Sequence, residues 1–248
     1  MKRRLRAAGL HLLVSLGIAA VAAALVFGIW YPPPYAAIAG GLSLFVLLVS
    51  VDVVLGPALT AVVASANKPT KELRRDIALI ALVQAAAFAY GMHAIAVARP
   101  VYMVFEVDRL TIVSAVDIDP ADLTQAGPGF GSLPWTGPRL IAARRAADSA
   151  EMLRSLDLSF SGKDISMQPQ RWVEYDAMKA DILKASKPVS LLVEKHPELA
   201  EEVRGCEARA AAGDLRFLPL TSRRVIWTAL MTGADARVVC YLPVDGFL

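Results

Sequence analysis

Long apolar runs dominate the N-terminal part of the chain. Residues 10–30 contain no Asp, Glu, Lys or Arg, and a helix of that length spans about 31 Å, enough to cross a bilayer. A second run covers residues 36–64 with Asp52 as its only ionisable residue, and residues 77–97 form a third run. The pattern predicts three transmembrane helices. A cleaved signal peptide is the alternative for the first run, but signal h-regions extend over only about 7–15 residues, so we expect an uncleaved helix.

The charges between these runs predict their orientation. Basic residues precede the first run and recur at residues 65–76, whereas residues 31–35 carry no charge and include three prolines. By the positive-inside rule, both basic segments lie in the cytoplasm. Residues 1–98 are therefore predicted to form a three-helix transmembrane region of a bacterial inner membrane with a cytoplasmic N-terminus, and residues 99–248 a periplasmic domain. The long second run leaves one alternative open: if it re-entered the membrane instead of crossing it, this domain would be cytoplasmic.

The remaining residues show strand-like and helix-like patterns in turn. Residues 101–107 and 110–116 are rich in β-branched and aromatic residues and predict a β-hairpin with its turn at Asp108-Arg109. Four Gly and three Pro between residues 121 and 140 predict a long loop around Trp135. Helical patterning follows at residues 142–156, 172–185 and 198–211, and a final strand pair at residues 224–231 and 237–242. This order of elements predicts an α+β domain.

Composition agrees with a chain divided between membrane and water. Hydrophobic residues make up 56% and charged residues 20% of the chain, against about 45–50% and 25% in average soluble domains. These values argue against a purely soluble protein and exclude disorder. Residues 98–248 hold eighteen basic and twenty acidic residues. Because the other basic residues cluster at membrane ends, no basic stripe remains for a phosphate backbone; we expect the lipid bilayer as a partner and no nucleic acid.

Asp52 is the most informative polar residue of the predicted spans. A carboxyl group at the membrane centre costs roughly 2.5–3.5 kcal/mol on insertion scales and usually faces protein or water. Pro57 deprives the carbonyl of Val53 of its usual helical donor. Gln84 lies at a similar depth, each residue a few ångströms cytoplasmic of its span's midpoint. One interpretation is an Asp52–Gln84 hydrogen bond between helices; another is a partner-facing or proton-handling Asp52. Asp52, Gly56, Pro57 and Gln84 form the candidate intramembrane site.

The chain has two cysteines, Cys206 and Cys240. Cys206 falls on the apolar face of the helix predicted at residues 198–211, and Cys240 falls in the closing strand. A periplasmic location favours a disulfide between them. The alternative is a pair of separate buried thiols.

No pattern of catalytic or metal-binding residues stands out. His196, the one histidine of residues 99–248, precedes a proline in a charged stretch, as expected of a surface or capping residue. The nucleophile-elbow pattern Gly-x-Ser-x-Gly is absent, the glycines at residues 127–131 lack the Walker lysine, and the cysteines lack zinc-site spacing. We therefore expect no enzyme, cofactor, metal site or small-molecule substrate.

Four segments resemble one known family, the type IV pilin accessory proteins of the TfpX/TfpZ family. They are residues 2–15, the Trp30-Tyr31-Pro32 turn, residues 51–57 (Val-Asp-Val-Val-Leu-Gly-Pro), and residues 99–109, where Arg-Pro-Val-Tyr leads into Phe-Glu-Val-Asp-Arg. The resemblance covers about the first 115 residues. It implies an inner-membrane helper that promotes or tunes the assembly of a type IV pilin into pili, and it assigns no catalytic or binding residues.

The resemblance makes type IV pilin the expected partner. Our hypothesis is that the membrane helices guard the apolar helix of pilin, with Asp52 as a contact, while the α+β domain contacts the pilin head. The sequence leaves open whether the protein acts as a chaperone or as a regulator. A second function class is a membrane sensor or transporter subunit in which Asp52 and the Gly56-Pro57 pair form a polar pathway.

Overall fold

The apolar runs form long helices in the computed structural model, which describes residues 2–64, 69–210 and 214–248. Residues up to Arg99 make one compact unit, here called the membrane unit, and Pro100–Leu248 make a second, the α+β unit. The membrane unit contains α1 (Lys2–Leu25), a π-helical turn η1 (Val26–Trp30), α2 (Tyr35–Ile38), α3 (Gly41–Val63) and α4 (Thr70–Val97). Three of its helical stretches are long and apolar enough to cross a membrane: Leu5–Trp30, Gly41–Val63 and Thr70–Val97. The predicted class of three membrane helices followed by an α+β domain is confirmed.

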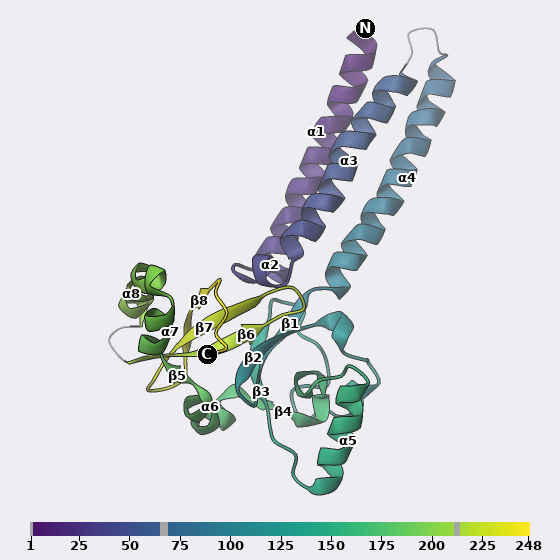
Figure 1. The fold of residues 1–248 in the computed structure, drawn as a ribbon. Coiled ribbons are helices and arrows are strands. Elements are labelled where there is room, and N and C mark those ends of the chain that lie inside the picture. The colour runs from purple at the N-terminus through teal and green to yellow at the C-terminus, as the bar shows by residue number, and fades with distance from the viewer. Residues whose placement is uncertain (1, 65–68, 211–213) are drawn as a thin grey trace. The chain divides into compact units, whose positions relative to one another are not determined.

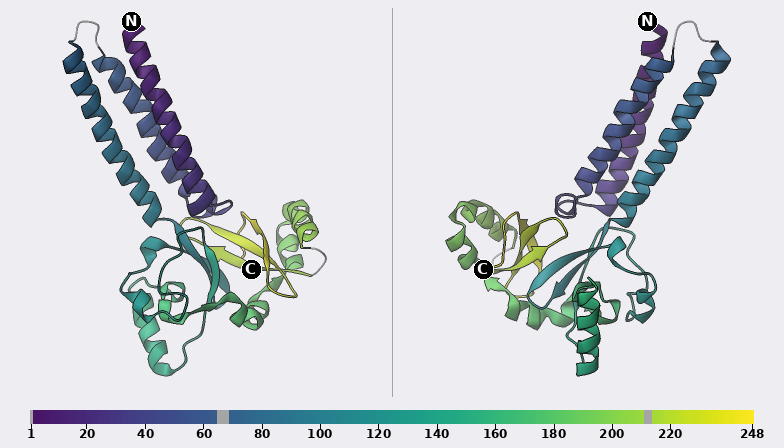
Figure 2. Two further views of the ribbon diagram at one scale, coloured as in Figure 1. Left: turned by 180° about the vertical axis from the view of Figure 1, so that it is seen from behind. Right: turned by 45° about the vertical axis from the view of Figure 1, so that its right-hand side comes forward.

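Helix α3 occupies the centre of the membrane unit and packs against both α1 and α4 (Figures 1 and 2). At the end where η1 meets the start of α3, a buried core forms around Trp30, Tyr31, Phe45 and Ile95. The Tyr31 hydroxyl donates to the carbonyl of Ile95 at 3.0 Å. This bond joins the segment after η1 to the end of α4.

The second and third helices begin at different residues from those predicted. Residues 36–64 form two helices, because Gly40 takes a left-handed conformation (φ 77°) and separates α2 from α3. The next position, residue 41, accepts only a residue without a Cβ, because a Cβ at Gly41 would lie 2.4 Å from the ring of Tyr31. Helix α4 begins at Thr70, so the basic segment is helical from that residue onward; Lys68 lies outside the described residues.

The described residues of the α+β unit build one mixed sheet in the order β4-β3-β1-β2-β6-β7-β8, with β5 paired to β6. The strands are β1 (Pro100–Glu106), β2 (Arg109–Ser114), β3 (Arg139–Ala143), β4 (Trp172–Glu174), β5 (Lys187–Pro188), β6 (Leu215–Thr221), β7 (Ile226–Thr232) and β8 (Val238–Leu242). The helices are α5 (Ser149–Phe160), α6 (Lys179–Ala185), α7 (Val189–Lys195) and α8 (Ala200–Arg209). Short 3-10 turns connect several of them, among them η7 (Pro197–Leu199).

The sheet has two halves, each with its own core (Figure 1). In the first half, β1 is buried along its whole length, and residues of β1 to β4 pack with the loop that carries Phe130. In the second half, α7 and α8 cover β6, β7 and β8. The halves join through a parallel pairing of β2 with β6, at Leu110–Leu220 and Thr111–Thr221.

Several predicted elements of this unit differ from the structure. The hairpin β1–β2 is confirmed, but its turn is one residue earlier, at Val107-Asp108, because Glu106 pairs with Arg109 and Val107 takes a positive φ of 53°.

The helices also begin later than the patterns indicated. Residues 142–143 end strand β3, and the following helix begins only after the N-cap Asp148. Residues 172–174 form β4, so the helix predicted there begins at Lys179. Helix α8 is shorter than residues 198–211, and Ala211 lies outside the described residues. The closing strands β7 and β8 fall within two residues of their predicted ranges.

Candidate functional site

Asp52 and Gln84 meet between α3 and α4. The Gln84 Nε2 atom donates to Asp52 Oδ1 at 3.2 Å and to the Asp52 main-chain carbonyl at 3.3 Å. Because α3 begins at Gly41 and α4 at Thr70, both residues lie at the middle of their helices. The sequence placed them closer to one end, since it began the second span at residue 36 and the third at residue 77. The structure therefore puts this polar pair near the middle of both helices.

Gly56 allows the two helices to approach closely around this pair, and Pro57 follows it within α3. A Cβ at Gly56 would lie 2.2 Å from Gln84 Nε2, so any other residue would displace the Gln84 side chain from Asp52. Helix α3 continues through Pro57 to Val63 without a break, and over its length from Gly41 it spans about 35 Å. Proline carries no N–H, so the carbonyl of Val53 lacks its helical donor one turn away.

A groove lies beside this pair, and we call it the α3–α4 groove. It has a volume of about 400 Å³. Its lining consists of Leu44, Leu47, Leu48, Val51, Asp52, Leu55 and Leu59 from α3 and Val83, Gln84, Ala87, Phe88, Gly91, Ala94 and Ile95 from α4. Twelve of these residues are apolar or glycine, and Asp52 and Gln84 are the exceptions. The groove is therefore apolar along its length apart from one polar spot.

A second hydrogen bond joins α1 to α3. His11 Nδ1 lies 2.6 Å from Thr60 Oγ1, and Thr60 is almost fully buried. A histidine and a threonine 49 residues apart offer no local pattern that could have predicted the contact.

Cys206 and Cys240 form a disulfide in the structure. The two Cα atoms are 5.9 Å apart, both residues are buried, and the bond ties α8 to β8. Val203 and Ala210 bury the same face of α8 against the sheet. Covalent attachment and apolar packing thus hold α8 on the second half of the sheet.

The α+β unit also carries an exposed apolar surface that the sequence analysis did not single out. Helix α5 presents four large apolar side chains that are between 45% and 89% exposed, here called the α5 stripe: Met152, Leu153, Leu156 and Phe160. At 3.6 residues per turn they fall within about 100° of one another around the helix. Apolar residues at such spacing ordinarily mark a buried face, and an exposed set marks an interaction surface.

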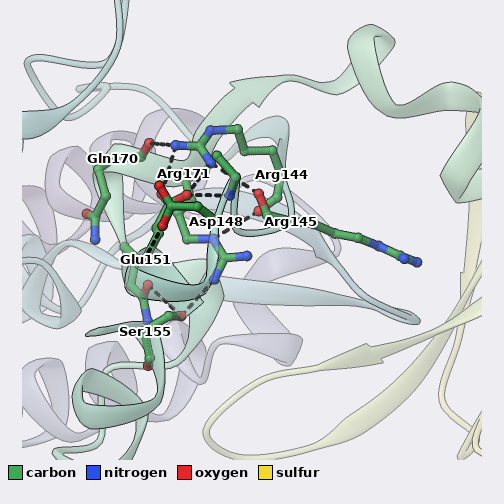
Figure 3. Close-up of polar contacts among 9 residues, drawn as sticks. Arg144, Arg145, Asp148, Glu151, Ser155, Gln170 and Arg171 are labelled. Carbon is green, nitrogen blue, oxygen red and sulfur yellow. Dashed lines mark hydrogen bonds and ion pairs between the residues drawn. The ribbon is translucent and has the colours of Figure 1, made fainter. Parts of the chain in front are cut away.

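A polar network anchors the base of α5 (Figure 3). Asp148 caps the helix by accepting from the main-chain N–H of Glu151 at 2.7 Å. Arg144 donates two hydrogen bonds of 2.8 Å to the two carboxylate oxygens of Glu151. Arg171 donates to Ser155 Oγ at 2.7 Å and to the Arg144 carbonyl at 2.9 Å.

Electrostatics agrees with this geometry. The hydrogen bonds from Arg144, together with the main-chain N–H of Ala147, lower the pKa of Glu151 to about 2. Burial lowers the pKa of Arg171 from its usual value. The network fixes the first two turns of α5, and it leaves the α5 stripe outside.

The remaining candidates have structural roles. His196 Nδ1 lies 3.2 Å from Glu198 Oε1 at the start of η7, in agreement with a surface or capping residue. The glycine segment at residues 127–131 belongs to the irregular loop that covers the first core, where Phe130 is buried. Among residues 2–64, 69–210 and 214–248, no group of three or more His, Cys, Asp or Glu is placed to hold a metal ion.

Three helices long and apolar enough to cross a membrane define the class of a polytopic membrane protein, with an apolar groove on one unit and an exposed apolar stripe on the other. A family model described as fimbrial assembly protein FimB matches residues 1–40. The chain is 36% identical over 242 residues to the fimbrial assembly protein of serogroup I from Dichelobacter nodosus, covering 96% of this chain and 94% of that protein. The chain belongs to this family of fimbrial assembly proteins.

Two further relatives from Dichelobacter nodosus agree. The serogroup E1 fimbrial assembly protein is 35% identical over 242 residues, with the same coverage of 96% and 94%. The protein of serogroups C1 and C2 is 46% identical over 118 residues, which is 48% of this chain and 90% of that protein. No solved structure matches the chain. The resemblance to a pilin assembly accessory family is confirmed at the level of the family.

Proposed function

We propose that this protein is a non-enzymatic accessory factor of the bacterial inner membrane that promotes or modulates the stability of type IV pilin and its assembly into pili, by direct contact with the pilin. The observation that carries the proposal is similarity over nearly the whole chain to proteins named fimbrial assembly proteins. Because both units align, both are expected to take part in the function.

The N-terminus lies in the cytoplasm and the α+β unit in the periplasm in this proposal. Three basic residues on the first two turns of α4 support the orientation, namely Lys71, Arg74 and Arg75, since basic residues gather on the cytoplasmic side. The segment between α1 and α2 carries no charge. The disulfide of the α+β unit is in keeping with an oxidising compartment.

Pilin contact involves both units. A membrane-embedded segment of pilin would pack on the membrane unit near Asp52, the interpretation in which this residue faces a partner. The water-exposed part of pilin would meet the α5 stripe, whose apolar side chains are otherwise exposed to water. Anchoring of α5 by the Glu151 network presents the stripe in one orientation, which reduces the entropy lost on binding.

Gene deletion with complementation tests the proposal. Loss of the gene is expected to reduce surface pili and twitching motility, and the wild-type gene to restore both. A gene that encodes a double variant of the α5 stripe, Leu153→Ser with Phe160→Ser, should produce the protein at its normal level in the deletion strain but should not restore pili. Val116→Ser, which changes another exposed apolar residue (58% exposed), is the matched control and should complement fully.

Two readouts separate the forms of the proposal. If pilin itself disappears in the deletion strain, the protein acts as a chaperone; if pilin persists and only pili are lost, it regulates assembly. Normal piliation in the deletion strain would refute the proposed function and favour the sensor or transporter class. Complementation by the stripe variant would refute the part played by α5.

A further inference from the structure

The polar spot of the α3–α4 groove presents hydrogen-bond acceptors in excess of donors. A carboxamide has two N–H bonds, and Gln84 directs both to Asp52, one to the carboxylate and one to the main-chain carbonyl. Gln84 Oε1 is buried and has no hydrogen-bond partner among the described residues. Asp52 forms no ion pair with a Lys, Arg or His among the residues that the structure describes. The carbonyl of Val53 also lacks its helical donor because of Pro57.

An excess of acceptors over donors is costly inside a membrane. At the middle of α3 and α4, the surroundings of the groove are hydrocarbon, and an unsatisfied polar group in hydrocarbon costs several kcal/mol. A lipid acyl chain would fill the groove but supplies no donor. An occupant that does supply one would satisfy the Asp52 carboxylate, which is only partly buried and lines the groove.

The shape of the groove fits a helix. On α3 its lining extends from Leu44 to Leu59, about 22 Å of helix axis. On α4 it includes Ala87 and Ala94, two small residues nearly two turns apart. Small residues at this kind of spacing let a neighbouring helix backbone approach closely in a membrane. Apart from the polar spot, the walls are apolar and suit the side chains of a membrane-spanning helix.

We propose that the α3–α4 groove binds the membrane-spanning helix of pilin, and that this helix carries a hydrogen-bond donor facing Asp52 and Gln84. The identity of the partner rests on the proposed function; the requirement for a donor rests on the acceptors of the groove. When Asp52 is ionised, a cationic donor such as an amine is the best complement, because it neutralises the carboxylate as well.

Site-specific photocrosslinking in cells tests this proposal with the full-length protein. One probe replaces Leu55 in the groove, and a second replaces Phe160 on the α5 stripe. A control probe replaces Val62, which is 75% exposed on the same helix and does not line the groove. Pilin adducts are expected at positions 55 and 160, and not at position 62.

Substitution of Asp52 tests whether the partner helix must carry a hydrogen-bond donor. Asp52→Asn keeps the size of the side chain and leaves one oxygen to accept from Gln84. It replaces the other carboxylate oxygen with an NH₂ group, which donates hydrogen bonds and cannot accept one. It should reduce the pilin adduct at position 55 about three- to twentyfold, the range that intramembrane hydrogen bonds account for. Asp52→Glu, which restores an acceptor-only side chain, should recover most of the adduct. The adduct at position 160 and the protein level monitor folding.

Each result has a defined meaning. A position-55 adduct that Asp52→Asn leaves unchanged would overturn the donor requirement. Adducts at position 160 but not at 55 would overturn the groove as the binding site and leave the proposed function standing. Absence of adducts at both positions, with normal protein levels, would overturn direct pilin contact itself.

Discussion

Removal of the Cys206–Cys240 disulfide is expected to destabilise the α+β unit by an amount that can be worked out from the chain. The bond closes a loop with a sequence separation of 34 residues. In the chain-entropy treatment, a loop of this length restricts the unfolded state by about 4 kcal/mol at 25 °C. For a folding unit of this size, about 1 kcal/mol shifts the midpoint of thermal unfolding by roughly 2–4 °C. We therefore expect the Cys206→Ala/Cys240→Ala variant to unfold about 8–15 °C lower than the parent.

Thermal unfolding of the detergent-solubilised full-length protein, followed by tryptophan fluorescence, measures this shift. Trp227 in β7 and the buried Trp172 in β4 both report on the α+β unit. Reducing the parent with dithiothreitol is the matched control, because it breaks the bond and keeps both sulfur atoms in the core. The reduced parent should fall close to the variant, and the variant should not respond to the reductant.

The small difference between reduced parent and variant measures the packing of the two sulfur atoms alone. Equal midpoints for the oxidised parent, the reduced parent and the variant would refute the reasoning. In that case the cross-link would contribute nothing to holding α8 on the sheet, and apolar packing of Val203 and Ala210 would account for the attachment of the helix.

Two further predictions concern local packing and charge. Gly41→Ala places a Cβ 2.4 Å from the buried ring of Tyr31, and overpacking of this kind costs about 1–3 kcal/mol; the variant should unfold earlier in detergent, whereas Gly28→Ala, with open space around it, should not. Arg144 lowers the pKa of Glu151 to about 2 from a usual value of 4.5, so this ion pair stabilises the fold fully above about pH 4.5 and loses that contribution as the pH falls toward 2. Urea unfolding should therefore show Glu151→Gln to be less stable than the parent at pH 7 and equally stable near pH 2, and a gap that persists at pH 2 would contradict this assignment.

The parts of the fold that could be predicted from the sequence depend on local patterns. Apolar runs long enough to cross a bilayer identify the membrane helices without knowledge of their neighbours, and the enrichment in β-branched and aromatic residues on either side of Asp108-Arg109 identifies the β1–β2 hairpin. Strand β6 was missed because it contains Arg216 and Pro219, and proline argues against a central strand. In the sheet, Pro219 lies between the residues that pair with β5 and those that pair with β2. Pro219 thus occupies the gap between two pairings of β6, and this gap is visible only in the tertiary structure.

The candidate sites divide in the same way. Asp52 and Gln84 could be paired from sequence, because a membrane interior makes polar residues rare and depth along a helix is easily counted. The α5 stripe could not be recognised as exposed, because the spacing of Met152, Leu156 and Phe160 is the spacing of a buried face. Whether such a face is covered depends on whether another element of the chain reaches it.

The membrane site shows how one glycine changes what a carboxyl–carboxamide pair can do. With any Cβ at position 56, the Gln84 side chain would be pushed away from α3, and its N–H groups would be free to point into the groove as donors. Gly56 instead lets Gln84 lie against α3, where both N–H groups bond Asp52 and the oxygen is left over. The close approach that joins the two helices thus removes every carboxamide donor from the groove. The pair therefore presents acceptors without a free donor, and this excess is the feature from which we propose a donor-bearing partner helix.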